Sequence, residues 1–448
     1  MRRICLLLIL VASLAHAQGV VVDGDFSDWP CGAIATTDPA GDAAGQLDVT
    51  GLAAVLMGGT LHVRLDIDAP ENLQADSQVT PDLSLIIEPD ALPALELQCR
   101  GRALRRIDTG QVLTWDAVRY AVSPTYAARS YEFRFDLSSL GSIGPAGVRL
   151  RLSGSDTLDA PLIVAQVSPD ELPAPAAADP LPMRTVRLAS LNTLRTGLFS
   201  PTQAPRLSRL LLAADADIYL LQEEYNSSEA QLRAFFDALR PPGKGASWHV
   251  HKRGDTAIVS RWPLVDLPNY GSSYSAAAAL TDDGPMVIVS IHPKCCGFIG
   301  SPEDQRRIEQ ADLTARLIDE VRAGKHDGKV ALAEAPVIIG GDWNLVGSRT
   351  PLDRLTEPQL PGMAEVRFVR AGAADTTTWR ELDGLGFAPG RLDLIVYDAE
   401  RLTPVEPEVW DTALMSPARL ARLGLEPADS TGSDHYLLVT RFARKADR

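Results

Sequence analysis

One stretch of the sequence limits the fold more than any other. The segment SPDELPAPAAADPLP, which begins at Ser168, is rich in proline, alanine and acidic residues and shows no apolar period. Such a segment is expected to be extended and exposed, as in a linker between separately folded units. We place this linker at residues 168–183. In a chain of 448 residues, the parts on both sides remain long enough to bury their own cores.

The part before the linker has the pattern of an all-β domain. Both TLHVRLDID (60–68) and YEFRFDL (131–137) carry an apolar residue at every second position, which is typical of half-buried strands. The opening VVVDGDFSDWP (20–30) resembles the start of the carbohydrate-binding-like β-sandwich modules found beside secreted bacterial enzymes. We therefore predict a smaller all-β sandwich domain over residues 18–167. It either recognises a glycan or surface ligand, or serves as a structural spacer with Trp29 in its core.

The part after the linker alternates strands with helices. TVRLASLN (185–192), ADIYLLQ (216–222), MVIVSIH (286–292) and APVIIGG (335–341) are short apolar runs typical of buried strands. APRLSRLLLAAD (204–215) predicts a helix, and so does the segment that opens with SPED at Ser301. Interleaved strands and helices predict an α/β sandwich over residues 184–445.

Polar side chains gather at the predicted strand ends. In α/β sheets, binding sites form in the crevice beyond those ends. The residues found there are Asn192, Glu223, His292, Asp342, Asn344, Asp393, Asp434 and His435.

The order of these motifs resembles the endonuclease/exonuclease/phosphatase superfamily, which has the deoxyribonuclease I-like fold. The ordered set is Asn192, LQE (221–223), GDTAIVSRWPL (254–264), the strand-ending histidine, GDWN (341–344), RLD (391–393) and SDH (433–435). The resemblance covers roughly residues 185–443 and implies an α/β four-layer sandwich after the smaller β domain. It also implies cleavage of phosphate esters with a divalent cation, usually Mg²⁺, in DNA, RNA, sphingomyelin or inositol phosphates.

Phosphodiester hydrolysis needs a cation near the non-bridging oxygens, an aligned water and a proton for the leaving oxygen. Because Mg²⁺ prefers oxygen ligands and keeps several waters, one or two carboxylates suffice. Glu223 is the first candidate ligand, helped by Asn192 and Asp434, with Mn²⁺ or Ca²⁺ as alternative ions. By resemblance, Asp342 orients or deprotonates the attacking water, and Asn344 steadies the phosphate or the site.

The two histidines have separate expected roles. By resemblance, His435 contacts the scissile phosphate while Asp393 fixes its tautomer, and His292 acts from the other side as hydrogen-bond donor or general acid. Taken singly, each acidic residue also fits a structural role: Asp342 could cap a loop, and Asp434 could start a turn. His292 stands where repair endonucleases of this superfamily carry a tyrosine. That departure disfavours a repair enzyme and leaves the deoxyribonuclease, sphingomyelinase and phosphatase branches.

The N-terminus and the charge indicate where the protein works. MRRICLLLILVASLAHAQG has the form of a secretory signal peptide over residues 1–17, and no later stretch approaches the ~20 apolar residues of a membrane helix. We expect a secreted or periplasmic protein. Its formal charge of −15 disfavours tight nucleic-acid binding. An enzyme that meets phosphate through a cation remains compatible with that charge.

Four cysteines follow the predicted signal peptide, and disulfides are expected in an oxidising compartment. A Cys31–Cys99 bond with a vicinal Cys295–Cys296 bond is the favoured arrangement, and bridges between the domains are the alternative. His292, Cys295 and Cys296 together would supply only three ligands, whereas a structural zinc site needs about four.

The sequence thus predicts a secreted, divalent-metal-dependent phosphoesterase. The expected reaction is phosphodiester hydrolysis of the nuclease or phospholipid and sphingomyelin type, by metal-assisted attack of water. The alternative is a catalytically inactive phosphoesterase-like protein that binds a phosphorylated or glycan ligand.

Overall fold

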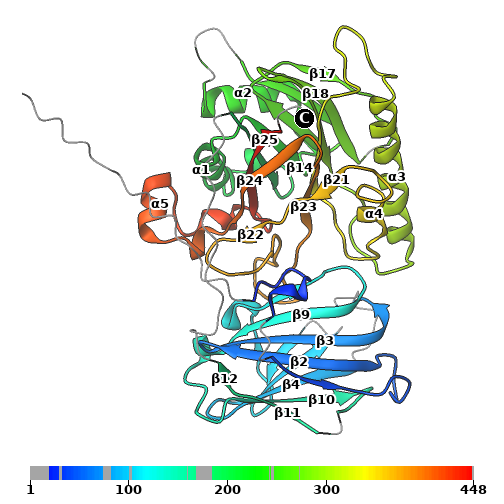
Figure 1. Cartoon of the computed structure of the whole chain (residues 1–448). Coiled ribbons are helices and arrows are strands. Elements are labelled where there is room, and N and C mark those ends of the chain that lie inside the picture. The colour runs from blue at the N-terminus through cyan, green and yellow to red at the C-terminus, as the bar shows by residue number, and fades with distance from the viewer. Residues whose placement is uncertain are drawn as a thin grey trace, which may run out of the picture.

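The structure is a computed structural model of the chain. It describes residues 20–29, 33–73, 82–99, 103–158, 160–167, 184–241, 243, 247–271 and 273–445. The predicted signal peptide (1–17), the predicted linker (168–183) and Cys31 lie outside the described residues. The described residues form an N-terminal β-sandwich and a larger α/β unit (Figure 1). None of the helices within these ranges is long and apolar enough to cross a membrane.

Two sheets form the sandwich. The first has the order β1-β2-β3-β9-β8, with β12 paired to β2: β1 (Ile34–Thr37), β2 (Val49–Met57), β3 (Thr60–Glu71), β9 (Ala128–Asp136), β8 (Ala121–Ser123) and β12 (Gln166–Val167). The second has the order β11-β10-β4-β5-β6-β7: β11 (Leu162–Val164), β10 (Val148–Gly154), β4 (Leu83–Pro89), β5 (Leu95–Cys99), β6 (Ala103–Arg106) and β7 (Val112–Leu113).

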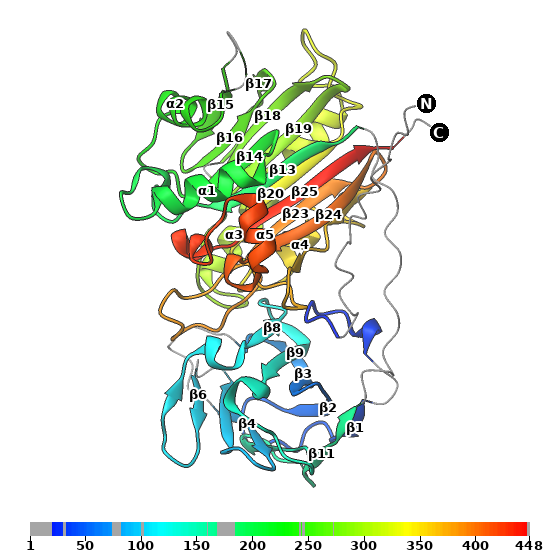
Figure 2. The same cartoon turned by 90° about the vertical axis from the view of Figure 1, so that its left-hand side faces the viewer.

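The predicted alternation places the apolar face of β3 and β9 in the core, but the opposite face is not all in solvent. Leu61 and Phe133 belong to the sandwich core. On the other face, His62 and Arg134 are paired across the two strands and are also buried. The reason is the α/β unit, because β8 and β9 lie on the side of the sandwich that faces it (Figure 1 and Figure 2). Arg134 makes an ion pair of 2.8 Å with Asp375 of that unit.

Trp29 differs from the expectation that it packs in the sandwich core. Its side chain is only partly buried, and its indole Nε1 donates a 2.6 Å hydrogen bond to Glu132. The segment around it lies between the two units (Figure 1), where Val22 pairs with Asp375 of the α/β unit. An indole with a polar partner fits the edge of an interface better than an apolar core.

The α/β unit contains two further sheets. The first has the order β15-β16-β14-β13-β25-β24-β22: β15 (His249–Arg253), β16 (Thr256–Ser260), β14 (Ile218–Gln222), β13 (Val186–Asn192), β25 (Leu437–Arg444), β24 (Leu402–Trp410) and β22 (Val369–Arg370). The second has the order β17-β18-β19-β20-β23-β21: β17 (Leu264–Asp266), β18 (Tyr274–Thr281), β19 (Gly284–Ile291), β20 (Val337–Asp342), β23 (Asp393–Asp398) and β21 (Met363–Glu365).

These two sheets are the middle layers of a four-layer sandwich, as predicted. One apolar cluster, with Leu220 and Ile338 among its members, fills the space between them. Helices α1 (Ala204–Ala214) and α2 (Glu229–Leu239) cover the first sheet, and α3 (Pro302–Arg322) covers the second. The shorter helices are α4 (Thr350–Asp353) and α5 (Pro417–Leu423). Ser301 caps α3 by accepting a hydrogen bond from the Asp304 amide.

Candidate active site

The ends of both inner sheets meet at one edge of the α/β unit and carry the predicted residues. In the first sheet, β13 ends at Asn192 and lies parallel to β14, which Glu223 follows directly. In the second sheet, β19 is followed by His292, and β20 ends at Asp342. Asp393, the first residue of β23, is the register partner of Asp342. His435 lies two residues before β25.

Asp342 is the centre of this group, and four nitrogen atoms surround its Oδ2. Asn192 and Asn344 donate from Nδ2 over 3.1 and 3.2 Å. The Nε2 atoms of His292 and His435 lie 3.4 and 3.6 Å away. The other oxygen, Oδ1, accepts a hydrogen bond from the Asn344 backbone N–H at 2.9 Å. Only 2 % of Asp342 is exposed, so these groups replace water around its charge.

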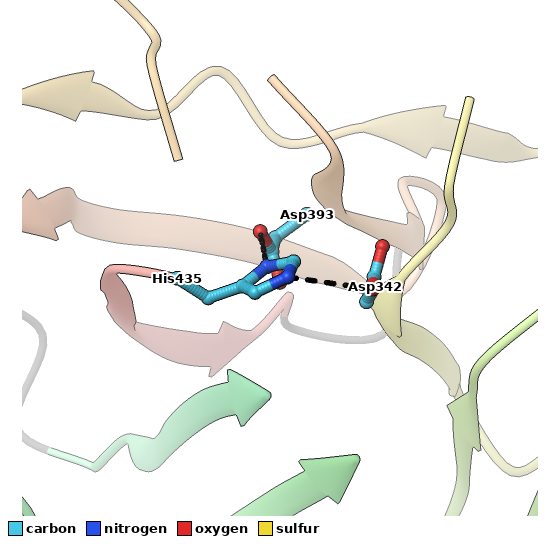
Figure 3. Close-up of side chains that lie close together, drawn as sticks. All are labelled: Asp342, Asp393 and His435. Atoms are coloured by element: carbon cyan, nitrogen blue, oxygen red, sulfur yellow. Dashed lines mark hydrogen bonds and ion pairs between the residues drawn. The ribbon is translucent and has the colours of Figure 1, made fainter. Parts of the chain in front are cut away.

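Each histidine is held by a second carboxylate. His435 Nδ1 lies 2.8 Å from Asp393 Oδ2, and its other nitrogen points toward Asp342 (Figure 3). His292 Nδ1 is paired in the same way with the carboxylate of Asp255. In both pairs the carboxylate accepts a hydrogen bond from Nδ1–H, which keeps the proton on Nδ1 and orients Nε2 toward the site.

These contacts determine the charges in the site. Burial raises the pKa of Asp342, but His435 and His292 outweigh burial and hold that pKa at about 2. Burial lowers the pKa of His435, but Asp393 and Asp342 raise it to about 10. Burial also opposes the charge on His292, yet its hydrogen bonds to Asp255 and Asp342 raise the pKa well above the usual value. A carboxylate and two imidazolium groups therefore face one another at neutral pH.

Glu223 and Asn192 form the part of the site that suits a metal ion. Glu223 Oε1 accepts from Asn192 at 3.2 Å, and Oε2 accepts the Arg195 amide at 2.8 Å. Among the described residues, no lysine or arginine side chain pairs with Glu223, whereas Asp342 pairs with His292 and His435. The Asn192 side-chain oxygen accepts the Leu194 backbone N–H at 3.0 Å. A carboxylate without a cationic partner is a ligand that a hard divalent cation prefers. The residues present therefore fit the metal ion.

Backbone geometry aims these side chains. Glu223 and Asn344 have φ values of 61° and 47°, in the left-handed region that residues with a side chain rarely adopt. Such conformations persist where surrounding contacts impose them, and they cluster at functional sites. Here each follows the end of a buried strand, and the Glu223 carboxylate reaches Asn192 while the Asn344 side chain reaches Asp342.

Asp434 lies at the edge of this arrangement. Its Oδ2 accepts the Trp379 indole N–H at 3.1 Å, and its Oδ1 lies 3.3 Å from Ser433 Oγ. Ser433 in turn donates to the Asn192 carbonyl. Among the residues that the structure describes, Asp434 is therefore joined to Asn192 through Ser433. Asp342, Asp393 and His435 also lie close enough together to offer three ligand atoms, one from each side chain, and the Asp393–His435 hydrogen bond joins Oδ2 to Nδ1.

Asp255 is the residue that sequence reasoning missed. It follows Gly254 in the turn between β15 and β16, and its carbonyl also accepts the Glu224 amide at 2.8 Å. The available signal was its position inside GDTAIVSRWPL, which belongs to the ordered motif set. Asp255 lies in a turn and not at the end of a buried strand, and the fold brings that turn beside His292 from a different strand pair.

Comparisons with known proteins were made for both sequence and structure. A search among curated proteins found no match. The human Nocturnin catalytic domain with bound sulfate is 17 % identical with a TM-score of 0.39, over 58 % of this chain and 95 % of that chain. Truncated TDP2 from Caenorhabditis elegans is 17 % identical with a TM-score of 0.36, over 58 % and 97 %. A beta toxin from Staphylococcus aureus with bound magnesium ions is 17 % identical with a TM-score of 0.37, over 57 % and 99 %.

The family assignment comes from the sequence. The model of the Endonuclease/Exonuclease/phosphatase family matches residues 189–435, which is more than half of the chain. The matched range contains all eight predicted site residues, and His435 is its last position. The chain therefore belongs to the Endonuclease/Exonuclease/phosphatase family, whose enzymes are metal-dependent phosphoester hydrolases.

Proposed function

We propose that this protein is a secreted phosphodiesterase that uses a divalent cation, with Mg²⁺ as the first candidate. The observation that carries the proposal is the set of nitrogen atoms around Asp342 Oδ2, in which both histidines are held by carboxylates. This is an ionised acceptor beside two oriented N–H donors, which is what attack of water on a phosphate ester requires.

Glu223 and Asn192 would hold the cation, with Asp434 supporting them through Ser433. When bound, the ion would neutralise charge on the phosphate oxygens. Asn344 supports the site differently, because its side-chain Nδ2 donates to Asp342 and to the Pro293 carbonyl, over 3.2 Å to each. It therefore fixes the distance between the strand-end carboxylate and the loop that follows His292.

Asp342 would orient the attacking water. A carboxylate with a pKa of about 2 is a weak base, so it accepts a hydrogen bond from water and takes the proton only as the new P–O bond forms. On the other side, protonated His292 donates a proton to the leaving oxygen as the old P–O bond breaks. His435 Nε2 is too far from Asp342 for a normal hydrogen bond, so its N–H is available to a phosphate oxygen.

Exposed side chains near the site favour a substrate with an aromatic or apolar part. Tyr225, two residues after Glu223, is 53 % exposed, and Phe298 in the loop after His292 is 42 % exposed. Burial, followed by the charges of Glu223 and Asp255, raises the pKa of Tyr225, so this ring lies beside the site residues. Nucleotides and phospholipids both carry such a part, and both belong in the substrate panel.

The test is hydrolysis by the purified protein of plasmid DNA, RNA, sphingomyelin, inositol phosphates and bis(p-nitrophenyl) phosphate, with Mg²⁺ and then with EDTA. We expect cleavage of one natural substrate that EDTA abolishes. Asp342→Ala and His435→Ala should each lose at least ~10²-fold in rate. His251→Ala, which removes a buried histidine outside the site, is the control. Full activity in either site variant, or in EDTA, would contradict the proposal.

Secretion has its own test. If residues 1–17 are a signal peptide, the protein exported by a bacterial host should begin at Gln18 by mass spectrometry. An exported protein that retains Met1 would contradict this part of the proposal.

A further inference from the structure

Three segments that carry site residues also touch the β-sandwich. Asn72, just beyond β3, is 2 % exposed and uses its whole side chain across the interface. Its Nδ2 donates to the Val346 carbonyl at 2.7 Å and the Gly347 carbonyl at 3.2 Å. Its Oδ1 accepts the Ile299 amide at 2.8 Å. One amide of the sandwich therefore joins the loop that follows Asn344 to the loop that follows His292.

Thr125 makes a second junction of the same kind. Its hydroxyl lies between two carbonyl oxygens, 2.9 Å from Leu345 and 3.0 Å from Arg391. Leu345 directly follows Asn344, and Arg391 is two residues before Asp393. Only 4 % of Thr125 is exposed, so water cannot replace the hydroxyl easily. The hydroxyl of one sandwich residue thus bridges the segments of two site residues.

The loop after Asn344 is fixed from both sides. From the sandwich, the Ala127 amide donates to the Gly347 carbonyl at 2.7 Å. From α3, buried Asp304 accepts the Ser348 amide at 2.8 Å. A Cβ on Gly347 would lie only 2.1 Å from the Asp304 carboxylate, so the loop has no room to move toward the helix. The sandwich contacts close the opposite direction.

From these contacts we propose that the β-sandwich is a part of the catalytic centre, with Asn72 and Thr125 as positioning residues. They hold the segments of His292, Asn344 and Asp393 at fixed separations. This inference rests on the proposed function, and it differs from a role of the domain as an independent glycan-binding module. Catalysis is sensitive to such separations, because a displacement of about 1 Å at a reacting group can cost about 10²-fold in rate.

The decisive variants remove the hydrogen bonds while keeping the shape. Thr125→Val replaces the hydroxyl by a methyl group, and Thr125→Ser restores the hydroxyl. Asn72→Asp keeps the acceptor for the Ile299 amide and loses the donors to the two carbonyls. Thr356→Val is the matched control, because Thr356 is also buried and donates at 2.9 Å to Leu352, inside the α/β unit.

Relative to Thr356→Val, we expect kcat to fall roughly 10- to 100-fold in Thr125→Val and Asn72→Asp, with KM changed less than about threefold. Thr125→Ser should recover most of the lost rate. A purely structural role would lower the unfolding temperature of Thr125→Val and Thr356→Val alike and leave kcat unchanged. Equal kcat in these two variants would overturn the inference while leaving the proposed function intact.

A second readout does not depend on turnover. In histidine-labelled protein, the Nδ1 proton of His435 reports its hydrogen bond to Asp393, and Thr125→Val should shift or broaden that resonance while Thr356→Val should not. An unchanged resonance in Thr125→Val overturns the inference, even if wild-type protein cleaves nothing in the panel. Absence of metal-dependent cleavage by wild-type protein would instead overturn the proposed function.

Discussion

The pair of Asp255 and His292 offers the sharpest test of the acid–base assignment. Asp255 contacts no other imidazole in the site, and its contact with His292 Nδ1 is on the side away from Asp342. Replacing Asp255 by asparagine keeps the size of the side chain and one acceptor oxygen. It removes the negative charge that favours the protonated form of His292.

The size of the effect follows from the bond that is weakened. A hydrogen bond to a charged group is worth roughly 1.5–3 kcal/mol, about twice a neutral one. If this stabilisation is expressed in the transition state, each ~1.4 kcal/mol corresponds to tenfold in rate. Asp255→Asn should therefore lower kcat roughly 10- to 150-fold at neutral pH. KM should change little, because Asp255 lies behind His292.

The pH dependence gives the direction independently. With Asp255 present, the pKa of His292 is raised well above its usual value, and the general acid stays protonated into the alkaline range. Without that charge the pKa falls, because burial opposes the charged imidazole and only Asp342 still favours it. The alkaline limb of the kcat profile should therefore move to lower pH in Asp255→Asn, and part of the lost rate should return as the assay is made more acidic.

The assay is kcat against pH, from about pH 5 to about pH 10, for wild type, Asp255→Asn and Asp266→Asn. Asp266→Asn is the control, because Asp266 lies 2.9 Å from Nδ1 of buried His251 and this aspartate–histidine pair is outside the site. It should leave the profile unchanged. An alkaline limb at the same pH in wild type and Asp255→Asn would refute the assignment of His292 as the acid.

Three further outcomes are expected. Glu223→Gln should raise the Mg²⁺ concentration for half-maximal rate at least about tenfold and weaken Mg²⁺ binding by calorimetry, because a neutral amide is a poorer ligand; unchanged binding would exclude Glu223 as a ligand. Burial, followed by Arg134, lowers the pKa of His62 from 6.5 to about 3. Because the unfolded chain then binds a proton that the folded protein does not, the free energy of unfolding should fall as pH drops below 6.5, by about 2 kcal/mol at about pH 5. Urea unfolding at about pH 5 and pH 7.5 should show this loss in wild type and less of it in His62→Gln. The Cys295 and Cys296 sulfur atoms lie 2.9 Å apart and are not covalently bonded to each other in the structure. In exported protein the peptide that contains them should have the mass of the vicinal disulfide; two alkylatable thiols there would contradict that pairing.

Much of the site could be predicted because its residues sit at strand ends. Asn192, Asp342 and His292 each terminate or follow an apolar run, and parallel or paired strands bring such positions to one edge of a sheet. The fold class was predictable for a related reason. Before residues 168–183 the apolar residues alternate as in β-strands, and after them strand patterns alternate with helix patterns. Because each element must bury its apolar face, few layer arrangements are possible for either part.

The information that can be read along the chain is therefore local: which segments are strands or helices, and which polar residues stand at their ends. Tertiary structure alone decided the contacts between elements distant in the chain. Asp255 meets His292 from another strand pair, and Thr125 reaches the Asn344 loop across 220 positions of sequence. The polar face of β3, where alternation predicts solvent, is buried at His62 because a second unit packs there. Periodicity describes the surroundings of a residue along its own element, whereas these contacts depend on how units with separate hydrophobic cores are placed against each other.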